Sequence, residues 1–247
     1  MSKKKLLITM GCSYTEGVGC WDMDITPPNL EAGKGKFEHY LNHPTNLNRF
    51  HEQGWPNRVG KKLGFDKVIN IGKKGGSTSG QVKKFVDTIS YKDFSEYETY
   101  IIFQLPNPDR FSFYKDESIW DVVPTENHSL SKEYIMNIHK DIDVLLEQRF
   151  YVSMLYEMCM NRNIKLSCFR IGKRYHNIDL KVFRKEYIPF YLVGNLDNKE
   201  IISPICNHFN EIGYEIISNM IKDEMNKKYS ELANVNEVDT IEWQYIE

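Results

Sequence analysis

A serine placed directly after a short apolar segment is the first residue in this chain whose type and position could support a reaction. The segment is residues 4–10, KKLLITM, and Gly11, Cys12 and Ser13 follow it. An apolar run between lysines and a glycine predicts a buried β-strand. A serine displayed at the end of such a strand can act as a nucleophile when a base takes its proton. Taken alone, Ser13 would more simply be a turn or helix-capping residue.

His208 is the candidate for that base, because an imidazole titrates near neutral pH and can accept the proton of a hydroxyl. It lies in the segment NHFNEIGYEII, where apolar residues begin to recur at helical spacing. Taken alone, His208 would be read as a surface histidine at the start of a helix. Ser13 and His208 lie near opposite ends of the chain, so only the fold can bring them together.

Strands and helices are predicted to alternate along the chain, which is typical of a parallel sheet covered by helices on both faces. We therefore expect an α/β fold with three layers, α/β/α, of the flavodoxin-like type, with a central parallel five-stranded sheet and long loop insertions. In the strand order 2-1-3-4-5, the loops after the first three strands lie side by side, where ligands bind in such sheets. The predicted strands are residues 4–10, 67–71, 99–105, 164–171 and 190–193, and helices are predicted near residues 55–63, 77–90, 131–161 and 209–220.

The expected domain organisation is one domain over residues 1–228, followed by a loose polar tail over residues 229–247. Residues 20–54 are rich in Pro, Asn, His and Gly, and predict a lid or insertion. Residues 106–130 predict a second long loop. Loops of this length are usually functional or mobile, so both are expected near a site.

The composition excludes several classes of protein. A net charge of −2 gives no general attraction for nucleic acid or an anionic membrane, so neither is expected as a partner. Five cysteines without a CxxC pair, and histidines without ligand spacing, predict no disulfide framework, no metal site and no cofactor. The run LLITM is too short for a signal-peptide core and no run could span a bilayer, so a cytoplasmic protein is expected.

With these residues in view, the chain resembles the SGNH or GDSL-type serine hydrolases, which are esterases, and particularly the divergent members encoded by bacteriophages. The matching blocks are Gly11-Cys12-Ser13, NIGKKGGST around Gly75, QLPNPDR around Asn107, and NHFNEIG around His208. The match spans residues 5 to about 220, and its third block is the least similar to the family pattern. A phage-encoded member could also be associated with the virion.

The resemblance implies metal-independent cleavage of an ester, through an acyl-enzyme on Ser13 with His208 as the base. It also implies an oxyanion hole made of the Ser13 N–H, the Gly75 N–H and the Asn107 side chain, with Gly76 as an alternative to Gly75. Such donors stabilise the negative charge of the tetrahedral intermediate. A carbohydrate carrying O-acetyl groups, or another small ester, is the implied substrate.

One position departs from the family pattern. The family carries an aspartate two or three residues before the histidine, and this chain has Cys206 and Ile205 there. A backbone carbonyl or a distant acid such as Asp197 could orient the imidazole, or the chain could work as a Ser–His dyad. It could also be a degenerate hydrolase retained as a structural protein, because losing the acid of a triad costs about 10⁴-fold in turnover.

Two further features bear on the ligand. Lysine pairs usually mark a solvated face, but Lys73 and Lys74 lie in the loop that carries Gly75, and Arg110 follows the third strand. Together they predict a positive site mouth and an anionic substrate, such as an acidic polysaccharide. In the alternative reading, GGSTSG at a helix N-terminus would bind a phosphate-bearing ligand or a glycan without catalysis.

Overall fold

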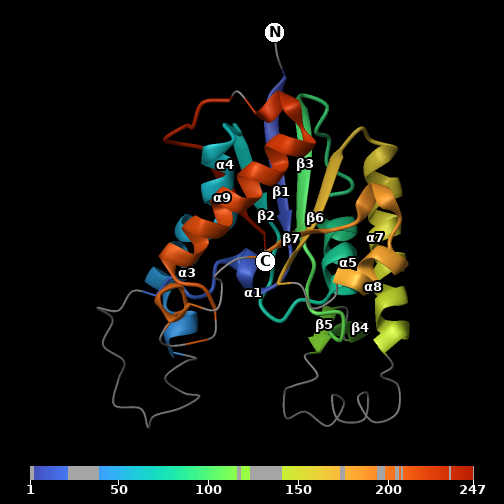
Figure 1. Cartoon of the computed structure of the whole chain (residues 1–247). Helices are drawn as coiled ribbons and strands as arrows, with labels where there is room; N and C mark the ends of the chain where they lie inside the picture. The colour runs from blue at the N-terminus through green and yellow to red at the C-terminus, as the bar shows by residue number, and fades with distance from the viewer. Residues whose placement is uncertain are drawn as a thin grey trace.

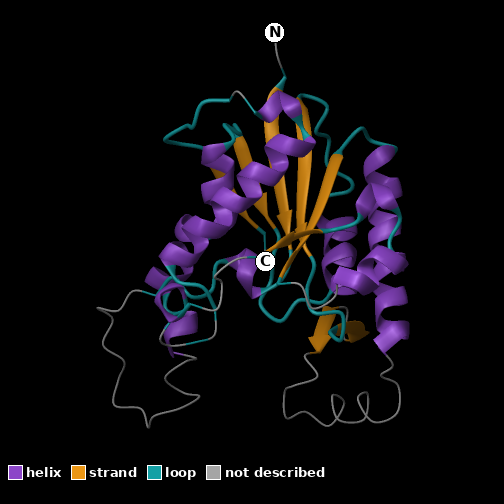
Figure 2. Ribbon diagram, viewed as in Figure 1, coloured by secondary structure: helices purple, strands orange, loops and turns teal. Residues whose placement is uncertain are grey.

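Parallel strands at the centre of the molecule form a six-stranded sheet in the order β7-β6-β3-β1-β2-β8. The computed structural model, drawn in Figures 1 and 2, describes residues 3–21, 39–115, 118–122, 141–172, 176–193, 198–203, 206, 208–233 and 235–246. All neighbouring strands of this sheet run parallel. The strands are β1 (Lys4–Met10), β2 (Lys67–Asn70), β3 (Tyr97–Gln104), β6 (Lys165–Ile171), β7 (Phe190–Leu192) and β8 (Glu242–Tyr245).

Helices cover both faces of the sheet, as Figure 2 shows. On one face α4 (Trp55–Lys62) and α9 (Glu211–Lys228) pack against each other and against the strands. On the other face lie α5 (Thr78–Thr88) and α7 (Asp141–Met160). The remaining helices are α1 (Ser13–Glu16), α3 (Pro44–Gln53) and α8 (His176–Val182), with short 3₁₀ helices η1 (Lys185–Tyr187), η2 (Lys199–Ile201) and η3 (Ser230–Leu232). The predicted three-layer α/β/α fold is therefore confirmed.

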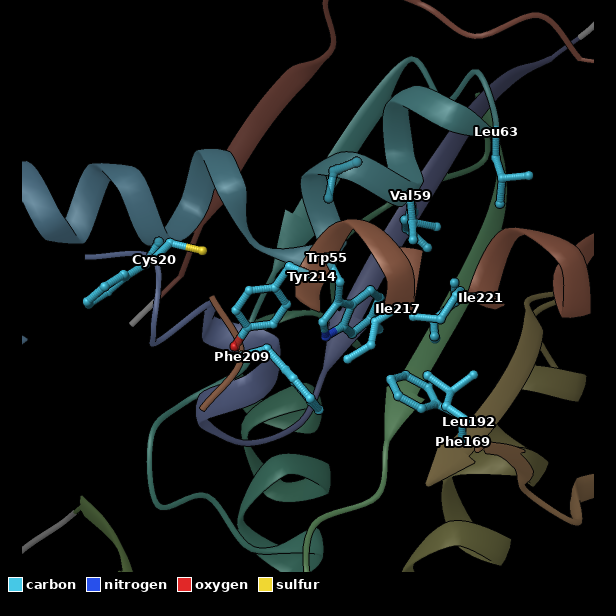
Figure 3. Close-up of a cluster of buried hydrophobic side chains, with 14 of the residues drawn as sticks. Cys20, Trp55, Val59, Leu63, Phe169, Leu192, Phe209, Tyr214, Ile217 and Ile221 are labelled. Atoms are coloured by element: carbon cyan, nitrogen blue, oxygen red, sulfur yellow. The ribbon is translucent and has the colours of Figure 1, made fainter. Parts of the chain in front are cut away.

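The sheet separates two hydrophobic cores, one on each face, and alternate residues of the same strand point into one or the other. Leu7 of β1 points into the core under α4 and α9, whereas Leu6 and Ile8 point into the core under α5 and α7. Because both faces are covered, strand β1 reads as a continuous apolar run rather than as an alternating one. Figure 3 shows the first core, where Trp55 and Tyr214 are fully buried.

The predicted strand order 2-1-3-4-5 corresponds to β2-β1-β3-β6-β7 and is confirmed. The number of strands was wrong, because β8 adds a sixth strand beside β2. β8 also corrects the prediction of a loose tail over residues 229–247. Trp243 packs against the core, and the Tyr245 hydroxyl donates to the Gly72 carbonyl at 3.2 Å. These aromatic residues alternate with polar ones, which is the pattern of a half-buried strand.

The two predicted loops contain regular structure. Within residues 106–130, β4 (Phe111–Lys115) and β5 (Ser118–Val122) form an antiparallel hairpin, so the loop prediction is wrong there. Both strands are rich in aromatic and β-branched residues, which favours pairing. Within residues 20–54, α3 begins at Pro44 and buries Phe50 completely, so residues 44–53 are not a free lid. The predicted helix over residues 131–161 is α7 from residue 141, and residues 131–140 lie outside the described part.

In the described parts of the chain, no helix combines the length and the apolar character needed to cross a membrane.

Candidate active site

The carboxyl ends of the central strands carry the candidate site, and Figure 1 places α1 and the β4–β5 hairpin at this same edge. Ser13 is the first residue of α1, directly after β1, and it is 6% exposed. Gly11 has a φ of 151°, and a β-carbon at this position would lie 2.1 Å from the Thr15 Oγ1 atom. Only glycine can make this turn, which leads the chain from the strand straight into α1.

Two buried glutamines hold the backbone before Ser13. The Gln81 side chain accepts a hydrogen bond from the Gly11 N–H at 3.1 Å. The Gln104 side chain accepts from the Cys12 N–H at 3.1 Å and also lies 3.0 Å from the Cys12 sulfur. Cys12 is therefore packed beneath the turn, while Ser13 faces the other way. Neither glutamine was predicted as a site residue, because single polar residues at the end of a strand or in a helix carry no periodic signal.

The structure brings Ser13 and His208 into contact. The Ser13 Oγ atom lies 2.6 Å from the His208 Nε2 atom, which is within hydrogen-bonding distance. A short antiparallel bridge between Ile202 and Phe209 fixes the segment that carries the imidazole, and the Ser203 N–H donates to the His208 carbonyl at 2.8 Å. A hydroxyl and an imidazole from opposite ends of the chain are thus placed for proton transfer.

The imidazole of His208 is held in its neutral form at neutral pH. Burial lowers the pKa of His208, and the nearby Arg110 guanidinium lowers it further, to about 4. Both effects disfavour the protonated ring, because each penalises a positive charge at this place. A neutral imidazole can accept the Ser13 proton, so the ring is available as a base over the ordinary pH range.

No carboxylate among the described residues orients this imidazole. The His208 Nδ1 atom is buried and has no hydrogen-bond partner in the described part of the chain. Cys206 replaces the usual acid at one position, while Ile205 and the suggested substitute Asp197 lie outside the described residues. Instead, the Tyr14 ring packs against the imidazole with ring centroids 4.8 Å apart. Among the described residues, Ser13 and His208 are therefore a hydrogen-bonded pair, called the dyad below, without an acidic partner.

The loop after β2 is tied to the helix that carries Ser13. The Asn70 side chain accepts a hydrogen bond from the Gly72 N–H at 2.9 Å and donates one to the Thr15 carbonyl at 2.8 Å. The Glu16 carboxylate accepts the backbone N–H of Lys74. Asn70 and Glu16 were not predicted as site residues, although an asparagine at the end of a strand was visible in the sequence.

Gly75 lies in this loop with a φ of 74°, which favours glycine. The Lys73 N–H donates to the Gly11 carbonyl at 3.1 Å, so the loop lies against the turn before Ser13. The Gly76 N–H is already donated to the Lys73 carbonyl at 2.9 Å, whereas the Gly75 N–H has no partner in the described residues. Of the two alternatives, Gly75 is the one with a donor to offer.

The loop after β3 carries Asn107 and Arg110, and the Arg110 N–H donates to the Asn107 carbonyl at 3.1 Å. The charge of Arg110 also lowers the pKa of His208. The Lys73 and Lys74 side chains are exposed, and the Lys74 ammonium lies 3.4 Å from the Asn42 amide oxygen. The structure shows no contact between these two ammonium groups and the dyad.

A buried polar network lies behind the Asn107 loop. Arg170, at the end of β6, forms an ion pair with Asp179, and both side chains are almost fully buried. Its guanidinium also donates to the Pro106 carbonyl at 3.3 Å and to the Gln148 side chain. Gln148 in turn donates to the Thr78 hydroxyl at 2.6 Å. The backbone preceding Asn107 is thus anchored to α5, α7 and α8.

Among the described residues, no group of three or more His, Cys, Asp or Glu side chains could hold a metal ion.

Comparison with solved structures supports the fold. No protein-family model matches the chain, and no curated protein matches it in sequence. Among solved structures, a carbohydrate esterase whose active site displays divergent catalytic and non-catalytic binding functions is similar over 94% of this chain and 71% of its own, at a TM-score of 0.54 and 10% identity. A family two carbohydrate esterase from Clostridium thermocellum, in complex with cellohexaose, is similar over 93% of this chain and 66% of its own, at a TM-score of 0.50 and 11% identity. The chain shares the fold of these carbohydrate esterases.

Proposed function

We propose that the protein is a serine esterase of the SGNH type that removes acyl groups, such as O-acetyl, from a carbohydrate. The observation that carries this proposal is the 2.6 Å contact between the Ser13 hydroxyl and a neutral His208. This contact lies at the carboxyl ends of the parallel strands, which is where such folds bind ligands. The shared fold with carbohydrate esterases supports the carbohydrate as the alcohol part of the ester.

In the proposed first step, His208 takes the proton of the Ser13 hydroxyl while the oxygen attacks the ester carbonyl. The carbonyl oxygen becomes an oxyanion, which the N–H groups of Ser13 and Gly75 and the Asn107 side chain would stabilise. Collapse of this intermediate breaks the ester bond, and the protonated His208 gives its proton to the leaving sugar hydroxyl. Water then attacks the acyl-enzyme by the same route and releases the acid and free Ser13. No step of this cycle requires a metal ion or a cofactor.

The low pKa of His208 has a consequence for the cycle. A ring with a pKa of about 4 is a weaker base than an ordinary histidine, but it readily gives its proton to the leaving alcohol. When His208 becomes protonated during the cycle, no acid among the described residues lies beside its Nδ1 atom. The imidazolium therefore has no negative counter-charge there. We therefore expect modest turnover for a serine hydrolase.

The function is tested by acetate release. Wild-type protein incubated with chemically acetylated cello-oligosaccharides is expected to liberate acetate, at the same rate with and without a metal chelator. Bovine serum albumin at equal concentration is the control for spontaneous hydrolysis. Release no faster than this control, across several acetylated sugars, would contradict the proposal and favour a glycan-binding protein without catalysis.

Asn107→Ala is expected to lower kcat by about 10²–10³-fold, because an oxyanion donor acts mainly on the transition state. The KM should change much less, because the ground-state carbonyl uses this donor weakly. Initial rates on an acetylated sugar over a range of concentrations give both constants. Asn226→Ala, a change in α9 well away from these loops, is the matched control. If Asn107→Ala lowers kcat by less than about threefold, Asn107 is not part of the oxyanion hole.

A further inference from the structure

Arg110, in the loop after β3, carries a positive charge that lowers the pKa of His208 and that the proposed reaction cycle does not use. It follows the Asn107 turn and precedes β4, whose first residues are fixed against α5. The Ser112 hydroxyl lies 2.9 Å from the Ser79 hydroxyl, and the Lys83 ammonium lies 3.3 Å from the Ser112 hydroxyl. The backbone on both sides of Arg110 is therefore anchored, so its side chain is presented from a fixed point.

One nitrogen of the partly buried Arg110 guanidinium lacks a hydrogen-bond partner. Its Nη1 atom is shielded from solvent, and within the described residues it has no hydrogen-bond acceptor and the side chain forms no ion pair. By contrast, Arg58 is bonded to the Glu215 carboxylate and to Gln53, and Arg170 to the Asp179 carboxylate. An unpaired buried donor is costly, so this arrangement is expected where a ligand supplies the acceptor.

The charge of Arg110 affects the pKa values of two side chains near Ser13. It lowers the pKa of His208, and it opposes the burial that raises the pKa of Tyr14 to about 12. Among the described residues, Ser13 and the Tyr14 ring of α1 contact the imidazole, and Arg110, from the loop after β3, is the charged group whose field reaches it. Arg110 is the cation of this set, and an anion bound to it would lie next to the reacting ester.

We propose that Arg110 binds an anionic group of the ester substrate, a carboxylate or a phosphate on the sugar, while Ser13 attacks the ester. The planar guanidinium presents two parallel N–H donors that match such oxyanions. This inference deepens the proposed function, on which it rests, by assigning an acidic sugar ester as the substrate class. It also couples binding to catalysis, since an anion on Arg110 offsets the charge that weakens His208 as a base.

The test compares acetylated glucuronic acid and acetylated glucose 6-phosphate with acetylated glucose. The wild type is expected to prefer at least one acidic ester, and Arg110→Met to reduce the ratio of kcat/KM for acidic over neutral ester by about 10–100-fold. Arg110→Lys should recover only part of this ratio, because it keeps the charge and loses the planar fork. Arg162→Met, at an exposed turn before β6, is the control that should retain the full ratio.

A second readout does not depend on turnover. Calorimetry with Ser13→Ala is expected to show glucuronate or glucose 6-phosphate binding more tightly than glucose, with this preference lost in Ser13→Ala/Arg110→Met. The stronger of the two anions identifies the carboxylate or the phosphate as the group bound. Equal binding of glucose and both anions would overturn the inference, even if the enzyme is active. Absence of hydrolysis would refute the proposed function, and the calorimetry would still decide the role of Arg110.

Discussion

Ser13→Ala is expected to lower kcat by about 10⁴–10⁶-fold, which is the effect of removing a nucleophile whose base acts in concert with it. The hydroxyl is the group that would form the covalent bond to the acyl carbon, and it lies 2.6 Å from the His208 Nε2 atom. The neighbouring Cys12 cannot replace it, because the Cys12 side chain is buried and lies against Gln104. The measurement is acetate release under saturating substrate.

The loss must come from chemistry rather than from unfolding. Removing one hydroxyl from a residue that is 6% exposed should move the thermal midpoint by only a few degrees. Ser230→Ala, at the exposed first residue of η3, serves as the matched control and should retain wild-type kcat. A Ser13→Ala protein with a normal thermal midpoint and more than a tenth of wild-type activity would rule out Ser13 as the nucleophile.

His208→Gln is expected to lower kcat by a similar factor, about 10⁴–10⁶-fold, because glutamine can hydrogen-bond to Ser13 but cannot take its proton. The double variant Ser13→Ala/His208→Gln should be no slower than either single variant, since the two residues act as one unit. His176→Gln, whose ring packs on Tyr191 away from the dyad, is the control. Strictly additive losses in the double variant would contradict a shared step.

The same residue sets the pH dependence. Protonation of the imidazole removes the base, and its pKa of about 4 means that kcat/KM should stay constant from neutral pH down to about pH 5. Below pH 4 it should fall about tenfold per unit. Recovery of activity on return to neutral pH separates this titration from acid unfolding. A loss of kcat/KM centred near pH 6.5 would show that the pKa of His208 is unperturbed. It would contradict the burial of this side chain and the effect of Arg110 on it.

Much of the fold could be predicted because the sequence carries it as periodic apolar segments. Strands β1, β2, β3 and β6 are short apolar runs separated by helical segments, and such alternation permits few topologies. The sixth strand and the hairpin escaped because they depend on tertiary context. Tyr245 becomes part of a strand only because the edge of β2 is open and Gly72 accepts its hydroxyl.

The residues of the site divide in the same way. Ser13 and His208 could be found because glycine–serine after a strand and histidine before a helix have chemical meaning at those places. Gln104, Asn70 and Arg170 could not, because a buried polar residue becomes a support only through partners that are distant in sequence. Gln104, for example, acts on the backbone of Cys12 at 3.1 Å, and nothing in the residues around it indicates this contact.

The most direct test of the account is labelling with a fluorophosphonate, which reacts much faster with a serine that a base has activated than with other hydroxyl groups. We predict a single labelled site on the wild-type protein, located to Ser13 by peptide mass spectrometry, and no label on Ser13→Ala or His208→Gln. An unlabelled wild type in its folded state, or a label on any other serine, would contradict the proposal that Ser13 and His208 form a catalytic pair.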